Sequence, residues 1–158
     1  GCCMKSRTIL LLSCATALLL SVGCLKGPDG ESGGDEIRPK ATELKLEKWV
    51  PGEVSWKKGD RTDWFVVNVK ADGLLKIEIN VDRTDKSIDV VLTDTYGRRI
   101  KKVNSKRDGK FHRFPLQAEK GQKYYVMIRC ATTKDSSEYS IRATVKEETK
   151  DPKILRPE

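Results

Sequence analysis

Alternation of apolar and polar residues with a period of two runs through most of residues 44–146 and constrains the fold more than any other feature. The segment 74–81 sets Leu75, Ile77 and Ile79 against polar side chains on the opposite face of an extended chain. The same alternation recurs in the segments 63–70, 87–94, 123–130 and 138–145. One apolar and one polar face per segment predicts antiparallel strands in a two-layer arrangement.

Short turn sequences separate these segments. They are Lys58-Gly59-Asp60, Ala71-Asp72-Gly73, Thr95-Tyr96-Gly97, Arg107-Asp108-Gly109 and Lys120-Gly121-Gln122. Glycine after aspartate supplies the positive φ that hairpin turns need. Seven or eight short strands at this spacing predict an all-β fold, a single antiparallel β-sandwich over residues 44–146.

The N-terminal region has the features of an export signal. Lys5 and Arg7 precede an apolar stretch of 14 residues, 9–22, which is too short to span a membrane of about 30 Å comfortably. We take Met4 as the natural start and residues 1–3 as additional.

Residues 20–24 read Leu-Ser-Val-Gly-Cys and resemble the lipobox of bacterial lipoproteins. That resemblance implies that residues 1–23 are a cleaved signal peptide and that Cys24 carries diacylglycerol and an acyl chain, which together anchor a protein stably. Leu25, by the sorting rule of enteric lipoproteins, implies the outer membrane, with the domain facing the periplasm or the cell surface. An ordinary secretory signal is the alternative.

The remainder divides into three parts. Residues 24–43 are rich in glycine, proline and charge, and we expect a lipidated flexible linker with a reach of about 25 Å. Residues 44–146 form the sandwich, and residues 147–158 form a disordered tail.

The order of motifs across residues 50–146 resembles the bacterial pre-peptidase C-terminal domain. The motifs are Gly59-Asp60, Asp63-Trp64-Phe65, Asp89-Val90-Val91-Leu92, Tyr96-Gly97, Gly121-Gln122-Lys123-Tyr124-Tyr125-Val126 and Ser137-Glu138-Tyr139-Ser140-Ile141. The resemblance implies a jelly-roll-like sandwich that is not itself catalytic, and some members of the family bind calcium or extracellular polymers.

Residues 97–113 concentrate positive charge, and we expect them to form a hairpin. The cations are Arg98, Arg99, Lys101, Lys102, Lys106, Arg107, Lys110 and Arg113, against the single acid Asp108. The whole chain has a formal net charge of +8, and removal of Lys5 and Arg7 with the signal peptide leaves 8 − 2 = +6. Such a cluster suits lipid phosphates, an anionic glycan or an acidic protein face, or it is a solvated edge that discourages aggregation.

Catalytic and metal-binding arrangements find little support. His112 is the only histidine, and Cys130, which shares the apolar face of its strand, is the only cysteine left after lipidation. One His and one Cys fall short of a zinc site. We expect no cofactor beyond the lipid; Asp63 and Asp89, which match acids in the family motifs, leave calcium as the alternative.

These observations favour a lipid-anchored, non-enzymatic binding or scaffold subunit of a bacterial envelope assembly, with an envelope protein as partner. The first alternative is a module that binds an anionic polymer, lipopolysaccharide or peptidoglycan, or an anionic lipid. A hydrolase dependent on His112 is the third hypothesis. Export and the lack of a recognition helix argue against nucleic acid.

Overall fold

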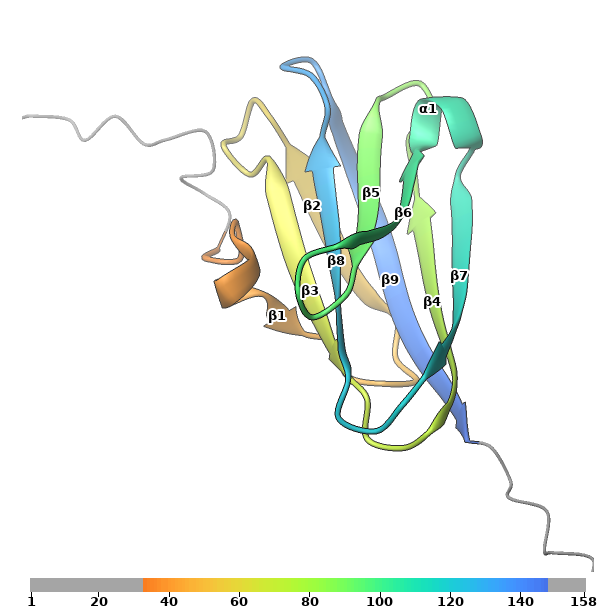
Figure 1. Ribbon diagram of the computed structural model, residues 1–158. Coiled ribbons are helices and arrows are strands. Elements are labelled where there is room, and N and C mark those ends of the chain that lie inside the picture. The colour runs from red at the N-terminus through yellow and green to blue at the C-terminus, as the bar shows by residue number, and fades with distance from the viewer. Residues whose placement is uncertain (1–32, 148–158) are drawn as a thin grey trace, which may run out of the picture.

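The computed structural model describes residues 33–147, and these residues form two β-sheets packed face to face (Figure 1). The strands are β1 Thr42–Glu43, β2 Val50–Ser55, β3 Thr62–Asn68, β4 Gly73–Val81, β5 Ile88–Thr93, β6 Arg99–Asn104, β7 Phe111–Ala118, β8 Lys123–Cys130 and β9 Ser136–Glu147. A 3₁₀ turn, η1, covers Arg38–Lys40, and a four-residue helix, α1, covers Ser105–Asp108.

One sheet has five strands in the order β1-β3-β8-β5-β6, and the other has four in the order β2-β9-β4-β7. Every pairing is antiparallel except that of the short β1 with β3. The predicted antiparallel β-sandwich is therefore confirmed, with nine strands among the described residues in place of the seven or eight predicted. Within residues 33–147, no helix has the length and apolarity needed to cross a membrane.

The alternating apolar residues fill the space between the sheets. The residues buried to zero exposure include Leu75, Ile77, Ile79 and Val81 of β4, Ile88, Val90 and Leu92 of β5, and Val126 and Ile128 of β8. Buried residues alternate with more accessible ones along β3, β7 and β8, as the period of two requires, whereas all six residues of β5 are buried. Leu44, where the chain passes from the five-stranded to the four-stranded sheet, is also buried in this core.

The segment 33–43, which the sequence assigned to the flexible linker, is packed against the sandwich. The main-chain N–H of Trp64 donates to the carbonyl oxygen of Asp35 (3.0 Å), and Thr42 and Glu43 pair with β3. The free edge of β3 thus gains a partner strand. This pairing gives hydrogen bonds to main-chain N–H and C=O groups at that edge, which the pattern of side chains does not reveal. The strands also continue to Glu147, one residue past the predicted boundary.

The predicted signal peptide, the lipidated Cys24, linker residues 25–32 and tail residues 148–158 lie outside the described residues.

Candidate functional site

The basic segment is not a hairpin, and that part of the prediction is wrong. β6 is the edge of the five-stranded sheet, α1 follows it, and β7 is the edge of the four-stranded sheet, so the segment crosses between layers. The Ser105 hydroxyl secures the crossing: it accepts from the N–H of Ile88 (3.0 Å) and donates to the carbonyl of Lys86 (2.8 Å). The Asn104 side chain caps α1 by accepting from the N–H of Lys106.

The eight predicted cations are all exposed, and they fall into two groups. Four have carboxylate partners: Arg98 with Asp94 (2.6 Å), Lys102 with Asp89 (3.0 Å), Arg107 with Asp108 (2.8 Å) and Arg113 with Glu78 (2.9 Å). The other four are Arg99, Lys101, Lys106 and Lys110, and among the described residues the structure gives them no ion pair. An external anion could therefore pair with these four side chains without displacing an acid of the described domain.

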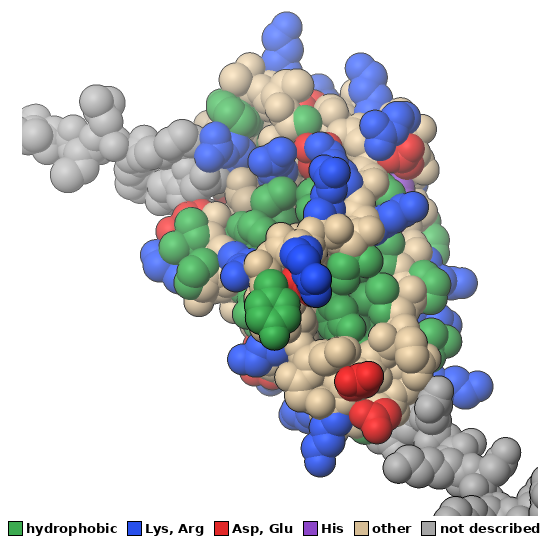
Figure 2. All heavy atoms as spheres, in the orientation of Figure 1, with side chains coloured by type: hydrophobic (Ala, Val, Ile, Leu, Met, Phe, Trp, Pro, Cys, Tyr) green, Lys and Arg blue, Asp and Glu red, His purple; other side chains and the backbone are tan. Residues whose placement is uncertain are grey.

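An apolar depression of about 250 Å³ lies between β6 and β7, and we call it the side groove. It is lined by Leu92, Ile100, Lys101, Arg113, Phe114, Pro115 and Leu116. On the face seen in Figure 2, apolar side chains gather in this part of the molecule with Lys and Arg side chains around them.

A β-bulge in β6 shapes the groove. Lys101 pairs with Leu92 and Arg99 pairs with Thr93, so that Ile100 is the extra residue and is 42% exposed.

Both strands that flank the groove are protected against pairing with a further strand. The bulge in β6 interrupts its outer edge, and its cations repel other basic edges. In β7, Pro115 has no N–H to offer. A partner would therefore contact the β6 and β7 edges chiefly through side chains and not by adding a strand.

The two acids of the calcium hypothesis are not brought together. Asp89 faces outward on β5, where it meets Lys102 (3.0 Å), Arg129 (3.5 Å) and Asn104 (2.9 Å). Burial acts to raise the pKa of this carboxyl, but the hydrogen bonds from Asn104 and Lys102 outweigh it, and the pKa is lowered. Asp89 is thus already neutralised by protein cations.

Asp63 points into the core from β3 and accepts a hydrogen bond from the Tyr139 hydroxyl. Burial raises the pKa of Asp63 to about 8. A carboxyl that holds its proton is a poor calcium ligand. Among residues 33–147, no group of three or more His, Cys, Asp and Glu side chains is arranged to hold a metal ion.

His112 and Cys130 are both buried, in different sheets. Burial lowers the pKa of His112, and its Nε2 has no hydrogen-bond partner in the structure. The Cys130 thiol donates to the carbonyl of Asp135 (3.2 Å), and burial raises its pKa to about 11. The prediction that Cys130 lies in the core is confirmed, and the arrangement offers no exposed nucleophile beside a base.

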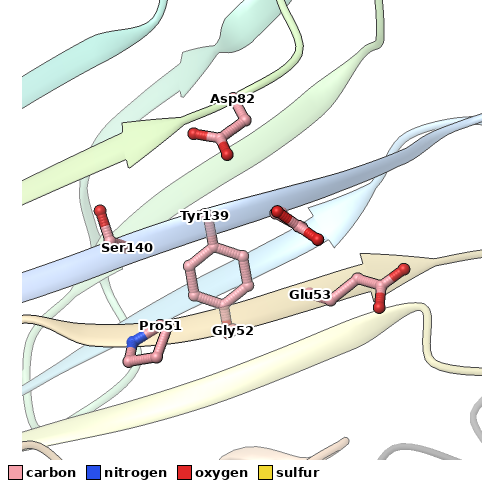
Figure 3. Close-up of a pocket in the computed structure, with 7 residues that line it drawn as sticks. Pro51, Gly52, Glu53, Asp82, Tyr139 and Ser140 are labelled. Carbon is pink, nitrogen blue, oxygen red and sulfur yellow. The ribbon is translucent and has the colours of Figure 1, made fainter.

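Sequence reasoning did not find an acidic depression of about 590 Å³ on the four-stranded sheet. Figure 3 shows Tyr139 lying across Gly52, with carboxylates from Glu53 and Asp82 nearby. Glu138 completes its acidic lining. The residues come from β2, β9 and the end of β4, and only the sheet order brings them together. Lys58, outside this lining, binds Glu53 (2.5 Å), and no cation is among the described residues that line the depression.

No protein-family model matches the chain, and no curated protein matches it. Among solved structures, the fold is similar to the pre-peptidase C-terminal domain of a collagenase from Bacillus anthracis, with 18% identity over 66% of this chain and 94% of that chain and a TM-score of 0.54. The Yersinia pseudotuberculosis-derived mitogen also matches, with 16% identity over 66% and 89% of the two chains and a TM-score of 0.45. The predicted resemblance to the pre-peptidase C-terminal domain is confirmed at the level of fold.

Proposed function

We propose that this protein is a non-catalytic binding module of the bacterial envelope, anchored in the outer membrane by lipid on Cys24, that docks an acidic partner protein in the side groove. The observation that carries the proposal is the side groove itself, an apolar floor bordered by Lys101, which has no ion pair among the described residues, and by Arg113, which is paired with Glu78. Interfaces commonly combine a desolvated apolar centre with a polar rim.

The charge of the rim selects the partner. Arg99 and Lys101 lie on β6 beside the exposed Ile100, and neither is paired with an acid among the described residues. Cations of this kind raise association rates with acidic surfaces and disfavour basic ones. The protected edges of β6 and β7 favour contact through side chains over strand addition.

Affinity purification of the lipidated full-length protein from detergent-solubilised membranes tests the docking. We compare the native protein with the variant Arg99→Ser, Ile100→Ser, Lys101→Ser. A matched control, Lys45→Ser, Lys48→Ser, Trp49→Ser, removes two exposed cations and one exposed apolar side chain from the opposite side of the sandwich. A defined protein retained by the native and control proteins and lost from the variant supports the proposal. Equal retention by all three contradicts it.

A second candidate is a module for lipopolysaccharide or peptidoglycan, favoured by the same unpaired cations. Retention on immobilised glycan that weakens with salt, in the absence of any co-purifying protein, would support this reading instead.

The anchor has its own test. The native protein should partition into the detergent phase on cloud-point separation and incorporate labelled fatty acid. Cys24→Ser should abolish incorporation, whereas Cys130→Ser should leave it unchanged, because Cys130 is buried in the sandwich. Labelling that survives Cys24→Ser would exclude this anchor.

A further inference from the structure

A second depression, of about 410 Å³, lies between the β5–β6 turn and the β7–β8 turn, and we call it the phosphate cup. Its lining includes Tyr96, Arg98, Lys120 and Lys123, and its only acid is Asp94. The Asp94 carboxylate is already engaged by Arg98 (2.6 Å). The cup therefore presents three cationic side chains with one carboxylate, a lining that suits an anion.

The aromatic side chain at the rim of the cup is held out into solvent by an ordered turn. Tyr96 is 80% exposed. Asp94 fixes the turn by accepting from the main-chain N–H groups of Tyr96 and Arg98, each at 2.9 Å. The Arg98 guanidinium lies 5.7 Å from the centroid of the Tyr96 ring. An exposed tyrosine beside cations is typical of side chains that sit at the headgroup level of a bilayer.

The N-terminal segment is tied to the same turn. The Arg38 Nη1 donates to the carbonyl of Thr95 (3.3 Å), and its guanidinium lies 5.0 Å over the ring of Tyr125. Gly97 permits this approach, because its φ is +84° and a Cβ there would come within 2.8 Å of the Arg38 Nη1. Arg38 thus ties the N-terminal segment to the turn that carries the cup, and from Arg38 the chain runs back beside β3 to Asp35, which is bonded to Trp64.

The distance to the proposed anchor is limited. From Cys24 to Gly33, where the described residues begin, there are 33 − 24 = 9 residue steps, and these span about 30 Å at most. A domain of this size has a radius of gyration of about 13 Å. The anchor therefore keeps the domain within about one domain diameter of the bilayer, where weak headgroup contacts become effectively intramolecular.

We infer that the phosphate cup binds phosphate-bearing headgroups of an anionic membrane, with Tyr96 at the interface, so that this end of the domain rests on the membrane that carries its anchor. The inference rests on the lipid anchoring proposed above. The membrane fits better than a separate acidic protein because the tether holds the bilayer within reach of the cup and the N-terminal segment is bonded to the turn that forms it. Contact at the cup would leave the side groove, on β6 and β7, available to the partner protein.

Co-sedimentation with lipid vesicles tests the inference without the anchor. The protein is a chain that begins at residue 24 with Cys24→Ser, which retains the whole two-sheet core. It should bind vesicles of phosphatidylcholine with 30% phosphatidylglycerol, bind pure phosphatidylcholine weakly, and be released by salt. The variant Tyr96→Ser, Lys120→Ser, Lys123→Ser should lose about tenfold or more in binding, from two cations and an aromatic side chain. The control Lys45→Ser, Lys48→Ser, Trp49→Ser should bind like the native domain.

Soluble glycerol phosphate distinguishes headgroup recognition from simple attraction to a charged surface. It should reduce vesicle binding by the native domain more strongly than sodium chloride does at equal ionic strength. All six substituted side chains are exposed, so equal melting temperatures show that the variants are folded. Equal vesicle binding by native and cup variants would overturn the inference. Absence of vesicle binding together with cup-dependent capture of an acidic protein would also overturn it, in favour of a protein ligand.

This assay requires neither lipidation nor a partner. Its failure leaves the affinity purification through the side groove unaffected, and loss of a co-purifying protein does not alter vesicle binding.

Discussion

The hydroxyl of Tyr139 on β9 donates a hydrogen bond to the carboxyl group of Asp63 on β3, and this bond joins the two sheets through the core. The ring of Tyr139 also packs edge-on against Phe65, with centroids 6.1 Å apart and planes at 82°. The bond sits beside two further acids, Asp60 and Asp35, whose charges affect Asp63. A buried carboxyl in this setting makes stability depend on pH.

Burial raises the pKa of Asp63 to about 8, the hydrogen bond from Tyr139 opposes the rise, and the charges of Asp60 and Asp35 add to it. In the unfolded chain the pKa of an aspartate is near 3.9. Between this pH and about pH 8, Asp63 therefore holds a proton in the native state that it has released in the unfolded state. The free energy of unfolding should therefore fall from about pH 4 to about pH 8, by up to about 1.4 kcal/mol per pH unit from this group.

Asp63→Asn should remove this contribution, so the variant should gain stability relative to the native protein as pH rises from 5 to 8. Urea unfolding at several pH values measures the difference. Because His112 titrates in both proteins, the comparison isolates Asp63. A constant difference across this range would contradict the assignment.

Glu78 is buried on β4 between two arginines, Arg142 at 2.5 Å and Arg113 at 2.9 Å. Arg142→Leu should lower the free energy of unfolding by about 1–3 kcal/mol, because Glu78 then keeps one partner. Lys76→Leu on the same strand is the control, since the structure gives Lys76 no ion pair among the described residues. An equal effect of both changes would count against a specific role for the pair.

The Glu78 pair also has a pH signature. The hydrogen bond from Arg142 lowers the pKa of Glu78 in spite of its burial, and Arg113 adds to the effect. Stability from a lowered carboxyl pKa is present above the unfolded value near 4.3 and is lost as pH falls through the folded value. The difference between native protein and Arg142→Leu should therefore shrink below about pH 4.

Gly52 lies under the ring of Tyr139, and a Cβ at position 52 would come within 2.3 Å of the ring. Gly52→Ala should displace the ring and weaken its bond to Asp63, at a cost of about 1–3 kcal/mol. Thermal unfolding followed by circular dichroism measures the loss. Ser140→Ala, a half-buried position on the same sheet, should change the melting temperature little.

Cys130 should be inert in the native protein. Burial raises its pKa to about 11, so almost no thiolate is present at pH 8. A disulfide reagent should label the thiol at pH 8 only after urea unfolds the lipid-free chain that begins at residue 24 with Cys24→Ser. Rapid labelling in the absence of urea would show that the thiol is accessible.

The sandwich could be predicted because the alternation of apolar and polar residues that specifies each strand lies within a short stretch of sequence. Each buried set, such as Leu75, Ile77 and Ile79, lies within a single strand, and alternation alone assigns its face. Glu78 shows the limit of the pattern: it lies on the predicted polar face, yet Arg113 and Arg142 cover it from two other strands.

The features that were missed depend on contacts between distant residues. The basic segment resembles a hairpin in sequence because nothing within residues 97–113 reveals that Ser105 bonds to the main chain of Lys86 and Ile88. Similarly, the polar composition of residues 33–43 conceals the bond from Arg38 to Thr95, 57 residues away. The phosphate cup joins two turns whose cations look like ordinary solvated side chains in the sequence.

The interrupted edges of β6 and β7 also bear on how copies of the protein would behave when crowded. Under the proposed anchoring, molecules share one plane, and neighbouring domains collide side by side far more often than in dilute solution. An intermolecular sheet needs an uninterrupted row of backbone hydrogen bonds along the edge strand. The bulge at Ile100 interrupts this row on β6, and Pro115, which lacks an N–H, interrupts it on β7. Under the proposed function, this surface can therefore bind a partner through its side chains while resisting sheet formation between copies of the protein.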